Sequence, residues 1–429
     1  MQLVTEELFL GLRQHPYVFF LDGEGNFESG RFSFLGARPF IVFRSTGDQY
    51  EYAGEKQGSG KGDPFRVLES LWRNYGACPG GNGGAFSGGL VGYISYDAGR
   101  LLEKIPNLGR EPSGVPDLFF GFYRDLYVFD HRNGKLLTLG NPPERRFASL
   151  KPLSPGARPL ESDFTRKGYC DAVRKAQEYI ACGDIYQVNL SQRFQLPFRE
   201  DPASLYLRLR RLTPAPFSAY LDCGDFQVLS TSPERFLKLE ARSAETCPIK
   251  GTRPRSEDPV EDERLAQELL SSIKDRAEHL MIVDLERNDL GRVCRYGSVH
   301  VEEFEELHRF PQVSHLISTV KGDLRENISP FDLIRATFPG GSITGAPKIR
   351  SMEIIEELEP VRRGVYTGAI GYIGFQDTLD LNIAIRTMIV QKDLAHFHVG
   401  GGIVADSDPE AEYQETLDKA RGIMMALKA

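Results

Sequence analysis

The sequence predicts an α+β fold in which mixed and antiparallel β-sheets are flanked by helices. In the first 150 residues, short apolar runs such as YVFFLDG, RFSFLGARPFIVF and LFFGFYRDLYVFDH alternate with turn residues, a pattern typical of antiparallel strands. In the rest of the chain, helical and strand-like spacings of apolar residues alternate. The 429 residues are 41% hydrophobic and 26% charged, the usual composition of a soluble globular protein with a large core.

The order of these patterns divides the chain into three segments. Residues 1–150 form a strand-rich region, in which the glycine-rich stretch GGNGGAFSGGLVGYISYDAGR is expected to be a loop that leads into a strand. Residues 151–164, KPLSPGARPLESDF, are proline-rich and nearly aperiodic, which favours a linker. Residues 165–429 make up the third segment. We expect the two outer segments to form one compact unit.

Most of the predicted helices lie in the third segment. Tyr169, Val173, Ala176 and Ile180 are spaced as on one face of a helix, and the strand-like run IYQVNLSQRF follows them. Further helices are predicted at 261–290, 329–337, 347–358 and 409–427, and further strands at 364–375, 380–390 and 395–404. No repeat of solenoid period is present, so a repeat architecture is excluded.

Charge and cysteine usage exclude several classes of protein. The net charge is −8 and no basic run stands out, so nucleic acid is not an expected partner. No apolar stretch reaches the ~18 residues of a membrane helix, and the N-terminus lacks the order of a signal peptide. The six cysteines form no CxxC pair, which favours reduced thiols in the cytoplasm over disulfides or a zinc site.

Two acidic pairs are candidates for binding a hard cation. Glu412 and Glu415 are three residues apart at the start of the last predicted helix, directly after the glycine run of FHVGGGIVADS. Asp275 and Glu278 have the same spacing in SIKDRAEHLMIVDLERNDLGR. Magnesium usually takes one or two carboxylates and keeps several waters. Each pair alone is explained better as solvated helix acids, such as an acidic first turn that favours the helix dipole.

Three further features are open to two interpretations each. The loop FPGGSITGAPKIR could bind an anion at a helix start or could be a plain helix entry, and its spacing is not that of a P-loop. Arg386, within LDLNIAIRTMIV, needs either a carboxylate ligand or a structural ion pair. His315 lies between apolar residues, where a histidine is more often part of the core than catalytic.

Taken together, these motifs resemble those of the chorismate-utilising enzymes. PIKGTRPR, ERNDLGR, FPGGSITGAPK, GAIGYIGF, NIAIRT and GGGIVADSDPEAEYQET occur in the order seen in that family. The resemblance is dense over 165–429 and weaker over 1–150, where FLGARPF and LVGYISYD are similar to the N-terminal region of anthranilate synthase component I. It implies a large sandwich of two β-sheets flanked by helices, with the active site between the sheets.

The resemblance also implies a bound magnesium ion and a set of substrate contacts. Glu278 and Glu415 correspond to direct metal ligands, and Asp275 and Glu412 to acids that bind through water. The metal would hold the ring carboxylate of chorismate. The residues implied to contact the enolpyruvyl carboxylate or line its pocket are Arg386, Tyr372, Thr344, Gly401 and Gly402.

Two further residues correspond to groups near the hydroxyl on ring carbon 4. Glu234, in STSPERF, matches the general acid that protonates this hydroxyl as it departs, and His315 matches a histidine beside it. A carboxylic acid serves in this way when partial burial raises its pKa toward neutrality.

Two positions separate the activities of the family. Isochorismate and salicylate synthases carry a catalytic lysine where this chain has Gln187, so the resemblance to them is weaker at that site. Anthranilate synthases usually read PIAGTR, whereas aminodeoxychorismate synthases read PIKGT, as here with Lys250. Lys250 is therefore expected to be a covalent nucleophile, with its pKa lowered by burial and by Arg253, Arg255 and the metal.

The resulting expectation is an aminodeoxychorismate synthase component I, which serves para-aminobenzoate and folate biosynthesis. The family usually takes its ammonia from a separate glutamine amidotransferase subunit, and the resemblance implies such a partner here. Anthranilate synthase component I is the nearest alternative, and a non-catalytic ligand-binding subunit is the alternative of another class. Relatives can also hold tryptophan near the N-terminal sheet, and its residues in 15–45 are not identified by sequence.

Overall fold

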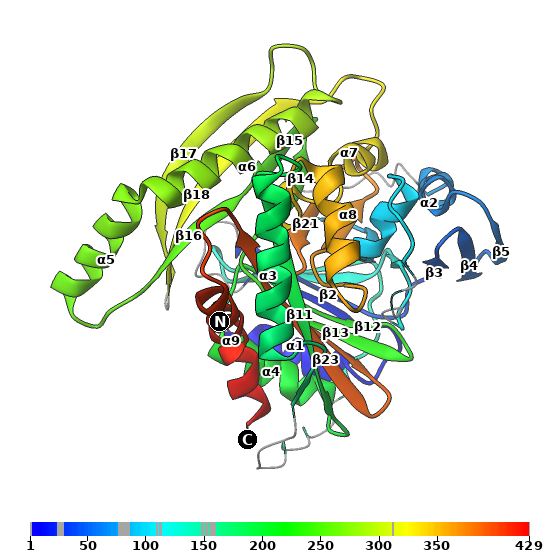
Figure 1. Cartoon of the computed structure of the whole chain (residues 1–429). Helices are drawn as coiled ribbons and strands as arrows, with labels where there is room; N and C mark the ends of the chain where they lie inside the picture. Colours follow the sequence, from blue (N-terminus) through cyan, green and yellow to red (C-terminus); the bar gives the residue numbers. More distant parts are fainter. Residues whose placement is uncertain are drawn as a thin grey trace.

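The fold is a two-sheet sandwich flanked by helices, as predicted (Figure 1). The computed structural model describes residues 2–23, 30–75, 86–108, 110, 114–146, 150, 153, 160–310 and 313–428. Every strand pair described is antiparallel, so the pairing is more uniform than the mixture we expected.

The first sheet contains eleven strands. In spatial order they are β10 (Glu161–Ser162), β11 (Gln187–Pro197), β23 (Leu394–Ile403), β22 (Thr387–Gln391), β13 (Phe226–Ser232), β12 (Phe217–Asp222), β1 (Phe19–Asp22), β2 (Phe32–Gly36), β8 (Leu126–Asp130) and β9 (Lys135–Leu139), while β19 (Gly345–Ala346) pairs with β11.

The second sheet contains twelve strands. In spatial order they are β16 (Ile249–Pro254), β18 (Val313–Asp323), β15 (Ser243–Cys247), β14 (Arg235–Glu240), β21 (Leu379–Ile383), β20 (Ala369–Gly374), β6 (Gly89–Ile94), β7 (Leu118–Tyr123), β3 (Ile41–Thr46), β4 (Gln49–Gly54) and β5 (Gly58–Lys61), while β17 (His300–Arg309) pairs with β18.

Strands from both ends of the chain lie side by side in each sheet. In the first sheet β1 pairs with β12, and in the second β6 pairs with β20, so the N-terminal 150 residues share both sheets with the later part. The end of the predicted linker forms β10, which pairs with β11. Residues 151, 152 and 154–159 of that linker, and residues 80–85 of the predicted glycine-rich loop, lie outside the described residues.

The helices lie around the sheets. They are α1 (Gln2–Leu12), α2 (Pro64–Arg73), α3 (Arg166–Ala181), α4 (Pro202–Leu212), α5 (Pro259–Ser271), α6 (Ile273–Gly291), α7 (Pro330–Thr337), α8 (Lys348–Leu358) and α9 (Pro409–Leu427), with short 3-10 turns at Tyr96–Leu101 and Gly341–Ile343. Helices α3, α7, α8 and α9 agree with the sequence pattern, whereas α1, α2 and α4 were not predicted.

The prediction of one helix over 261–290 is wrong. The chain leaves the helical conformation at Ser272, which has ψ near 106° and ends α5 while its hydroxyl accepts a hydrogen bond from the backbone N–H of Asp275 in α6. A serine that caps a new helix competes with continuation of the old one. Because of this break, α5 and α6 are two separate helices at one side of the molecule (Figure 1).

The prediction of one strand over 380–390 is also wrong. Residues before the break belong to β21 in the second sheet, and residues after it belong to β22 in the first sheet. Arg386 lies in the connection with φ of 49°, a left-handed conformation that ends the strand. Likewise, the strand expected at 364–375 begins only at β20, because 364–368 form turns.

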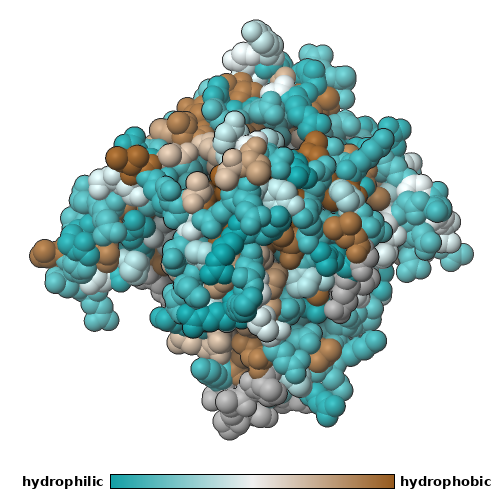
Figure 2. Space-filling model, in the orientation of Figure 1, coloured by the Kyte–Doolittle hydropathy of each residue, from teal (hydrophilic) through white to brown (hydrophobic). Residues whose placement is uncertain are grey.

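The core is built mainly from aromatic and branched side chains between the sheets. Phe19, Tyr93, Phe119 and Phe226 are at most 2% exposed and pack in one cluster. Burial of each such side chain contributes about 1.5–3 kcal/mol. The face in Figure 2 is mainly hydrophilic, with scattered hydrophobic side chains. Among the described helices, none is both long and apolar enough to span a membrane. The five described cysteines are free thiols.

Candidate active site

Lys250 lies at an irregularity in β16, under the junction of α5 and α6. Its pairing register with β18 shifts between Lys250 and Thr252, and Gly251 in between has φ of 74°. A Cβ on Gly251 would lie 2.7 Å from Leu269 Cδ1 and 3.3 Å from Asp275 Cβ. Glycine is therefore required here both by the backbone conformation and by the close packing. This bulge sets the direction in which the Lys250 side chain leaves the sheet.

Burial lowers the pKa of the half-buried Lys250, although nearby Glu278, Glu234 and Glu415 act in the opposite direction. Lys419 on α9 is the cation that lowers it further. Within the described residues, the Lys250 ammonium has no ion pair or hydrogen bond. The amine therefore lies among several carboxylates without being tied to any one of them, which suits a group that must lose its proton.

The predicted effect of Arg253 and Arg255 on Lys250 is not seen. Arg253 pairs with Glu268 at 2.8 Å and with Asp275 at 3.2 Å, and Arg255 pairs with Asp262 at 2.7 Å. Both guanidinium groups form ion pairs with acids of α5 and α6, and these pairs connect the two helices to β16 and the residue after it.

Glu234 lies in the connection between β13 and β14 and is only 5% exposed. Burial raises its pKa to about 7, while the hydrogen bond from Ser342 and the charge of Lys250 act against this shift. Ser342 Oγ donates to Glu234 Oε1 at 2.6 Å. A carboxyl group with this pKa is substantially protonated at neutral pH and can donate a proton to a leaving group.

The predicted anion loop, 338–350, reaches Glu234 through Ser342 rather than through Thr344. Thr344 is fully buried, and its hydroxyl donates to the carbonyl oxygen of Gly340 at 2.9 Å, so it stabilises the loop itself. Arg363 donates to the carbonyl oxygen of Ile343 at 3.0 Å and holds the loop from behind. The loop thus contacts the candidate acid Glu234 through Ser342, whereas the Thr344 hydroxyl bonds within the loop.

Arg386 and His315 face one small cavity of about 20 Å³, whose wall includes Phe310. Burial lowers the pKa of Arg386, whose guanidinium has no ion pair in the described part of the chain. His315 Nδ1 lies 2.9 Å from Thr252 Oγ1, and its buried Nε2 has no hydrogen-bond partner among the described residues. Burial and the charge of Arg386 lower the His315 pKa to about 4, so this imidazole is neutral.

A half-buried arginine without an ion pair, beside a neutral histidine, is suited to receive a carboxylate. The alternative of a structural salt bridge for Arg386, which the sequence left open, is not found among the described residues. The core interpretation of His315 explains its burial, but it leaves the Nε2 atom without a partner.

Tyr372 does not line this cavity. Its ring packs on Phe34 at 5.5 Å and on Phe86 at 4.4 Å, and it lines a much larger cavity on the other side of Pro216 and Pro233. A residue at this position of β20 faces the N-terminal strands because side chains alternate between the two faces of a strand. The grouping of Tyr372 with Arg386, expected from the sequence, is therefore not found.

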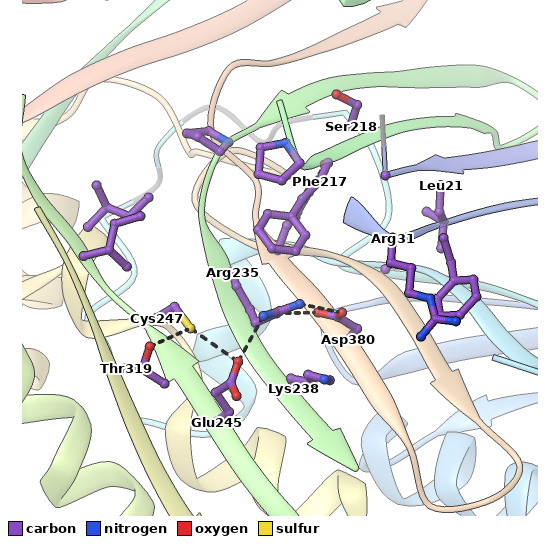
Figure 3. A pocket seen from close by; sticks show the side chains of 18 of the residues that line it. Leu21, Arg31, Phe217, Ser218, Arg235, Lys238, Glu245, Cys247, Thr319 and Asp380 are labelled. Atoms are coloured by element: carbon purple, nitrogen blue, oxygen red, sulfur yellow. Dashed lines mark hydrogen bonds and ion pairs between the residues drawn. The ribbon is translucent and has the colours of Figure 1, made fainter. Parts of the chain in front are cut away.

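The larger cavity has a volume of about 680 Å³ and lies between the sheets (Figure 3). Its floor carries Arg235, which bonds Asp380 at 3.0 Å and Glu245 at 3.0 Å, and Leu21 and Arg31 of the N-terminal region form part of its wall. The segment 15–45, whose contribution could not be identified from sequence, thus lines a cavity together with the C-terminal part.

The two predicted acidic pairs lie on α6 and α9 and are coupled electrostatically. Burial raises the pKa of Glu278, and the charges of Asp275 and Glu415 act in the same direction. Burial likewise raises the pKa of Glu412, with Glu415 again adding to it. Carboxylates that raise one another's pKa form a region of excess negative charge, which a cation would relieve.

Gly401 of β23 lies directly beneath the pair on α9. A Cβ on Gly401 would lie 3.2 Å from Glu412 Oε2 and 3.3 Å from Glu415 Oε1. The next residue, Gly402, approaches Gln187 instead, since a Cβ there would lie 2.2 Å from Gln187 Nε2. The glycine run therefore allows carboxylates and an amide to approach the strand from its two faces, and neither glycine is brought to the cavity of Arg386.

The four acids provide oxygen donors that suit magnesium, which prefers hard oxygen ligands and needs only one or two carboxylates. They do not form a preassembled cage, because no three of them have ligand atoms within 4.8 Å of one another among the described residues. Instead, Glu415 is paired with Lys419 at 2.7 Å. Lys419 was not predicted, although its position one turn after Glu415 was a signal that could have identified it.

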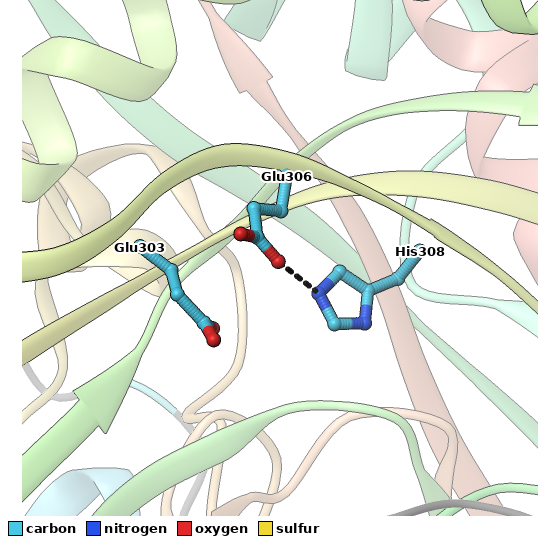
Figure 4. Close-up of side chains that lie close together, drawn as sticks. All are labelled: Glu303, Glu306 and His308. Carbon is cyan, nitrogen blue, oxygen red and sulfur yellow. Dashed lines mark ion pairs between the residues drawn. The ribbon is translucent and has the colours of Figure 1, made fainter.

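One compact group of possible ligands was not predicted at all. Glu303, Glu306 and His308 of β17 have ligand atoms within 4.8 Å of one another (Figure 4). A bulge, with Glu305 at φ of 53°, breaks the alternation of the strand and brings them together. Glu303 already accepts a hydrogen bond from Thr319 at 3.1 Å.

Comparison with known proteins identifies the family of the chain. A family model described as chorismate binding enzyme matches residues 19–425. The chain is 41% identical to anthranilate synthase component 1 of Thermus thermophilus, over 96% of this chain and 92% of the relative. It is 40% identical to aminodeoxychorismate synthase component 1 of Escherichia coli, over 100% and 97%, and 39% identical to that of Bacillus subtilis, over 93% and 90%.

Solved structures show the same fold. Anthranilate synthase component I from Streptococcus pneumoniae superposes with a TM-score of 0.82 at 34% identity, over 92% of each chain. MenF, the menaquinone-specific isochorismate synthase from Escherichia coli, superposes with a TM-score of 0.76 over 99% of this chain and 91% of MenF, but at 19% identity this likeness concerns the fold alone.

Proposed function

The chain belongs to the family of chorismate-binding enzymes, and within it we propose that it acts as aminodeoxychorismate synthase component I. It would convert chorismate and ammonia to 4-amino-4-deoxychorismate and water. The observation that carries the proposal is Lys250, whose amine lies near the buried acid Glu234 and has a lowered pKa. Relatives of both names are about equally similar overall, so the choice rests on this site rather than on identity.

The proposed first half-reaction joins lysine to the ring. The lone pair of the neutral Lys250 amine forms a bond to ring carbon 2, the ring double bonds shift, and the bond between carbon 4 and its hydroxyl breaks. Glu234 donates its proton to the departing oxygen, which leaves as water. Both groups need the protonation state opposite to the usual one at pH 7, and the burial described above favours that state for each.

In the second half-reaction, ammonia replaces the lysine. Ammonia forms a bond to carbon 4, the double bonds return, and the bond between carbon 2 and Lys250 breaks. The Glu234 carboxylate is placed to accept the proton released by the new ammonium group, which restores the acid. The enolpyruvyl group stays on the ring, so a separate lyase would have to release pyruvate to give para-aminobenzoate.

Substrate binding is proposed to use two charged regions. Arg386 would hold the enolpyruvyl carboxylate, with His315 beside the carbon 4 hydroxyl. Magnesium held by Glu278 and Glu415, with Asp275 and Glu412 binding through water, would supply positive charge for the ring carboxylate. The Tyr372 ring and the Thr344 hydroxyl are not part of this proposed pocket, because the ring packs on Phe34 and the hydroxyl donates to the Gly340 carbonyl oxygen.

The ammonia is proposed to come from a separate glutamine amidotransferase subunit. The relatives are called component 1, which implies a second component for them. Glutamine-dependent amination should therefore require a second chain, whereas an ammonium salt should suffice for this chain alone. Turnover of glutamine by the isolated chain would contradict this part of the proposal. The free thiols agree with a reducing compartment such as the cytoplasm.

Product analysis tests the proposed function directly. The pure chain is incubated with chorismate, magnesium and an ammonium salt, and the products are examined by mass spectrometry and fluorescence beside Lys250→Ala. Aminodeoxychorismate from the wild type and its loss in the variant are expected. Fluorescent anthranilate from the wild type would instead identify anthranilate synthase component I, the alternative that the overall similarity equally allows.

A further inference from the structure

Lys419 is a half-exposed member of the charged cluster on α9, and its ammonium has two partners. Its Nζ atom is 2.7 Å from Glu415 Oε1 and donates a hydrogen bond to the carbonyl oxygen of Gly400 at 2.9 Å. The ammonium is therefore fixed between the first turns of α9 and the glycine run of β23. Two fixed partners distinguish this pair from an ordinary helical ion pair, which has only one.

The oxygen that Lys419 contacts is the one that faces the other acid. Glu415 Oε1 and Glu412 Oε2 both lie over the open side of Gly401, at 3.3 Å and 3.2 Å from where its Cβ would be. The charge of Lys419 also lowers the pKa of Glu415 and Glu412 against the effect of burial. Lys274 of α6 acts on both acids in the same direction, whereas Lys419 is the cation of α9 that contacts Glu415 directly.

We propose that Lys419 is a built-in counter-ion for Glu415, and that a divalent cation can bind this carboxylate only by displacing the lysine ammonium from Oε1. The inference rests on the proposed metal site. A magnesium–oxygen bond is about 2.0–2.1 Å long, so an ammonium 2.7 Å from the same oxygen would crowd the ion and repel its two charges. Metal binding therefore includes the cost of breaking the lysine contacts.

The test is metal affinity measured without chorismate. Mg²⁺ is titrated into the full chain by calorimetry, with Mn²⁺ electron paramagnetic resonance as a second readout. Lys419→Met keeps the apolar stem and removes the ammonium. Loss of a half-exposed ion pair should raise the affinity for Mg²⁺ by a factor of about two to five. Loss of the repulsion between the ammonium and the divalent ion adds to this, so we expect Lys419→Met to bind Mg²⁺ roughly five- to tenfold more tightly than the wild type.

Two variants control for other causes. Lys419→Arg keeps the positive charge and should bind the ion as weakly as the wild type. Arg421→Met makes the same change in net charge two residues along α9, where Arg421 pairs with Asp418 at 3.0 Å, and it should leave the affinity within twofold. Equal tightening in Arg421→Met and Lys419→Met would mean a general charge effect and would overturn the proposal.

Glu415→Gln separates this inference from its premise. It should weaken binding strongly in the wild type and in the Lys419→Met background. Binding that survives Glu415→Gln, or an absence of binding in every variant, would place the ion elsewhere and overturn the inference. Unchanged or weaker affinity in Lys419→Met would overturn it as well. Because no substrate is present, none of these outcomes depends on which product the enzyme makes.

Discussion

Glu234→Gln should change how the stability of the protein depends on pH. Glutamine keeps the size of the side chain but cannot ionise. The Glu234 carboxyl has its pKa raised from 4.5 to about 7 by burial, so the folded state binds this proton more tightly than the unfolded state does. The stability that this group contributes is therefore complete below pH 4.5 and is lost as pH rises through about 7.

The size of the effect follows from the shift. A difference of about 2.5 pH units corresponds to about 3 kcal/mol at 1.36 kcal/mol per unit. For a chain of 429 residues, the unfolding entropy of about 2.1 cal/mol/K per residue sums to about 0.9 kcal/mol/K. Relative to the wild type, Glu234→Gln should thus gain about 3 °C in melting temperature between pH 4.5 and pH 9.

Thermal unfolding of both proteins at several pH values measures this difference without any substrate. Glu286, whose pKa is raised to about 8 by burial and partly by the Glu234 charge, titrates in both proteins, and its pKa should fall somewhat in Glu234→Gln. The exposed Glu410→Gln serves as a control for loss of a surface carboxylate. Ser342→Ala, which removes a hydrogen bond that lowers the Glu234 pKa, should make the loss of stability at high pH larger.

Parallel curves of melting temperature against pH for Glu234→Gln and wild type would refute this prediction. If the melting temperatures of Glu234→Gln and wild type differ by the same amount at pH 4.5 and pH 9, the carboxyl does not hold its proton at neutral pH. Glu234 would then be an unsuitable general acid in the free enzyme.

Three further predictions concern the other parts of the site. Lys250→Ala should lower carbon 4 amination by about a thousandfold or more if the lysine is the nucleophile, and full activity in this variant would exclude a covalent role. Gly251→Ala should lower stability by about 1–3 kcal/mol, because it places a Cβ 2.7 Å from Leu269 at φ of 74°, and an unchanged melting temperature would show that the bulge tolerates alanine. Arg386→Met should raise the KM for chorismate by about tenfold or more, since a charge-assisted hydrogen bond contributes about 1.5–3 kcal/mol, and an effect on kcat alone would argue against a binding role.

The sequence predicted those parts of the fold that follow from local patterns. Helix α9 begins and ends where the cap residues and the apolar spacing place it, because Asp408 caps the N-terminus and Pro409 occupies the first turn. The break at Ser272 was missed because a helix can contain a serine in its interior. Only the tertiary structure shows that Ser272 caps the N-terminus of α6. The split at Arg386 was missed because apolar residues on both sides belong to different sheets.

At the site, the sequence identified the charged residues better than their partners. Lys250, Glu234 and the acidic pairs were predicted, since unusual residue types in fixed motifs are visible without coordinates. The role of Ser342 was not predicted, because its hydrogen-bond partner Glu234 lies 108 residues away in the sequence. The side-chain direction of Tyr372 was not predicted either, because tertiary packing decides which face of a strand points to which neighbour. Arg253 and Arg255 were assigned to Lys250 by proximity in sequence, whereas their acids come from neighbouring helices.

The place of β23 in the first sheet affects how the protein can be made. This strand is completed only when residue 403 has been synthesised, yet it lies between β11 and β22 in the interior of the sheet. On the ribosome, more than 190 further residues must be synthesised before β23 can pair with β11. Until then one edge of β11 is unpaired, and such edges readily pair with other chains. Glu412 and Glu415 follow last of all, so a nascent chain released early would lack both the partner strand and half of the acids. Premature termination near the C-terminus should yield aggregation rather than a folded chain with reduced activity.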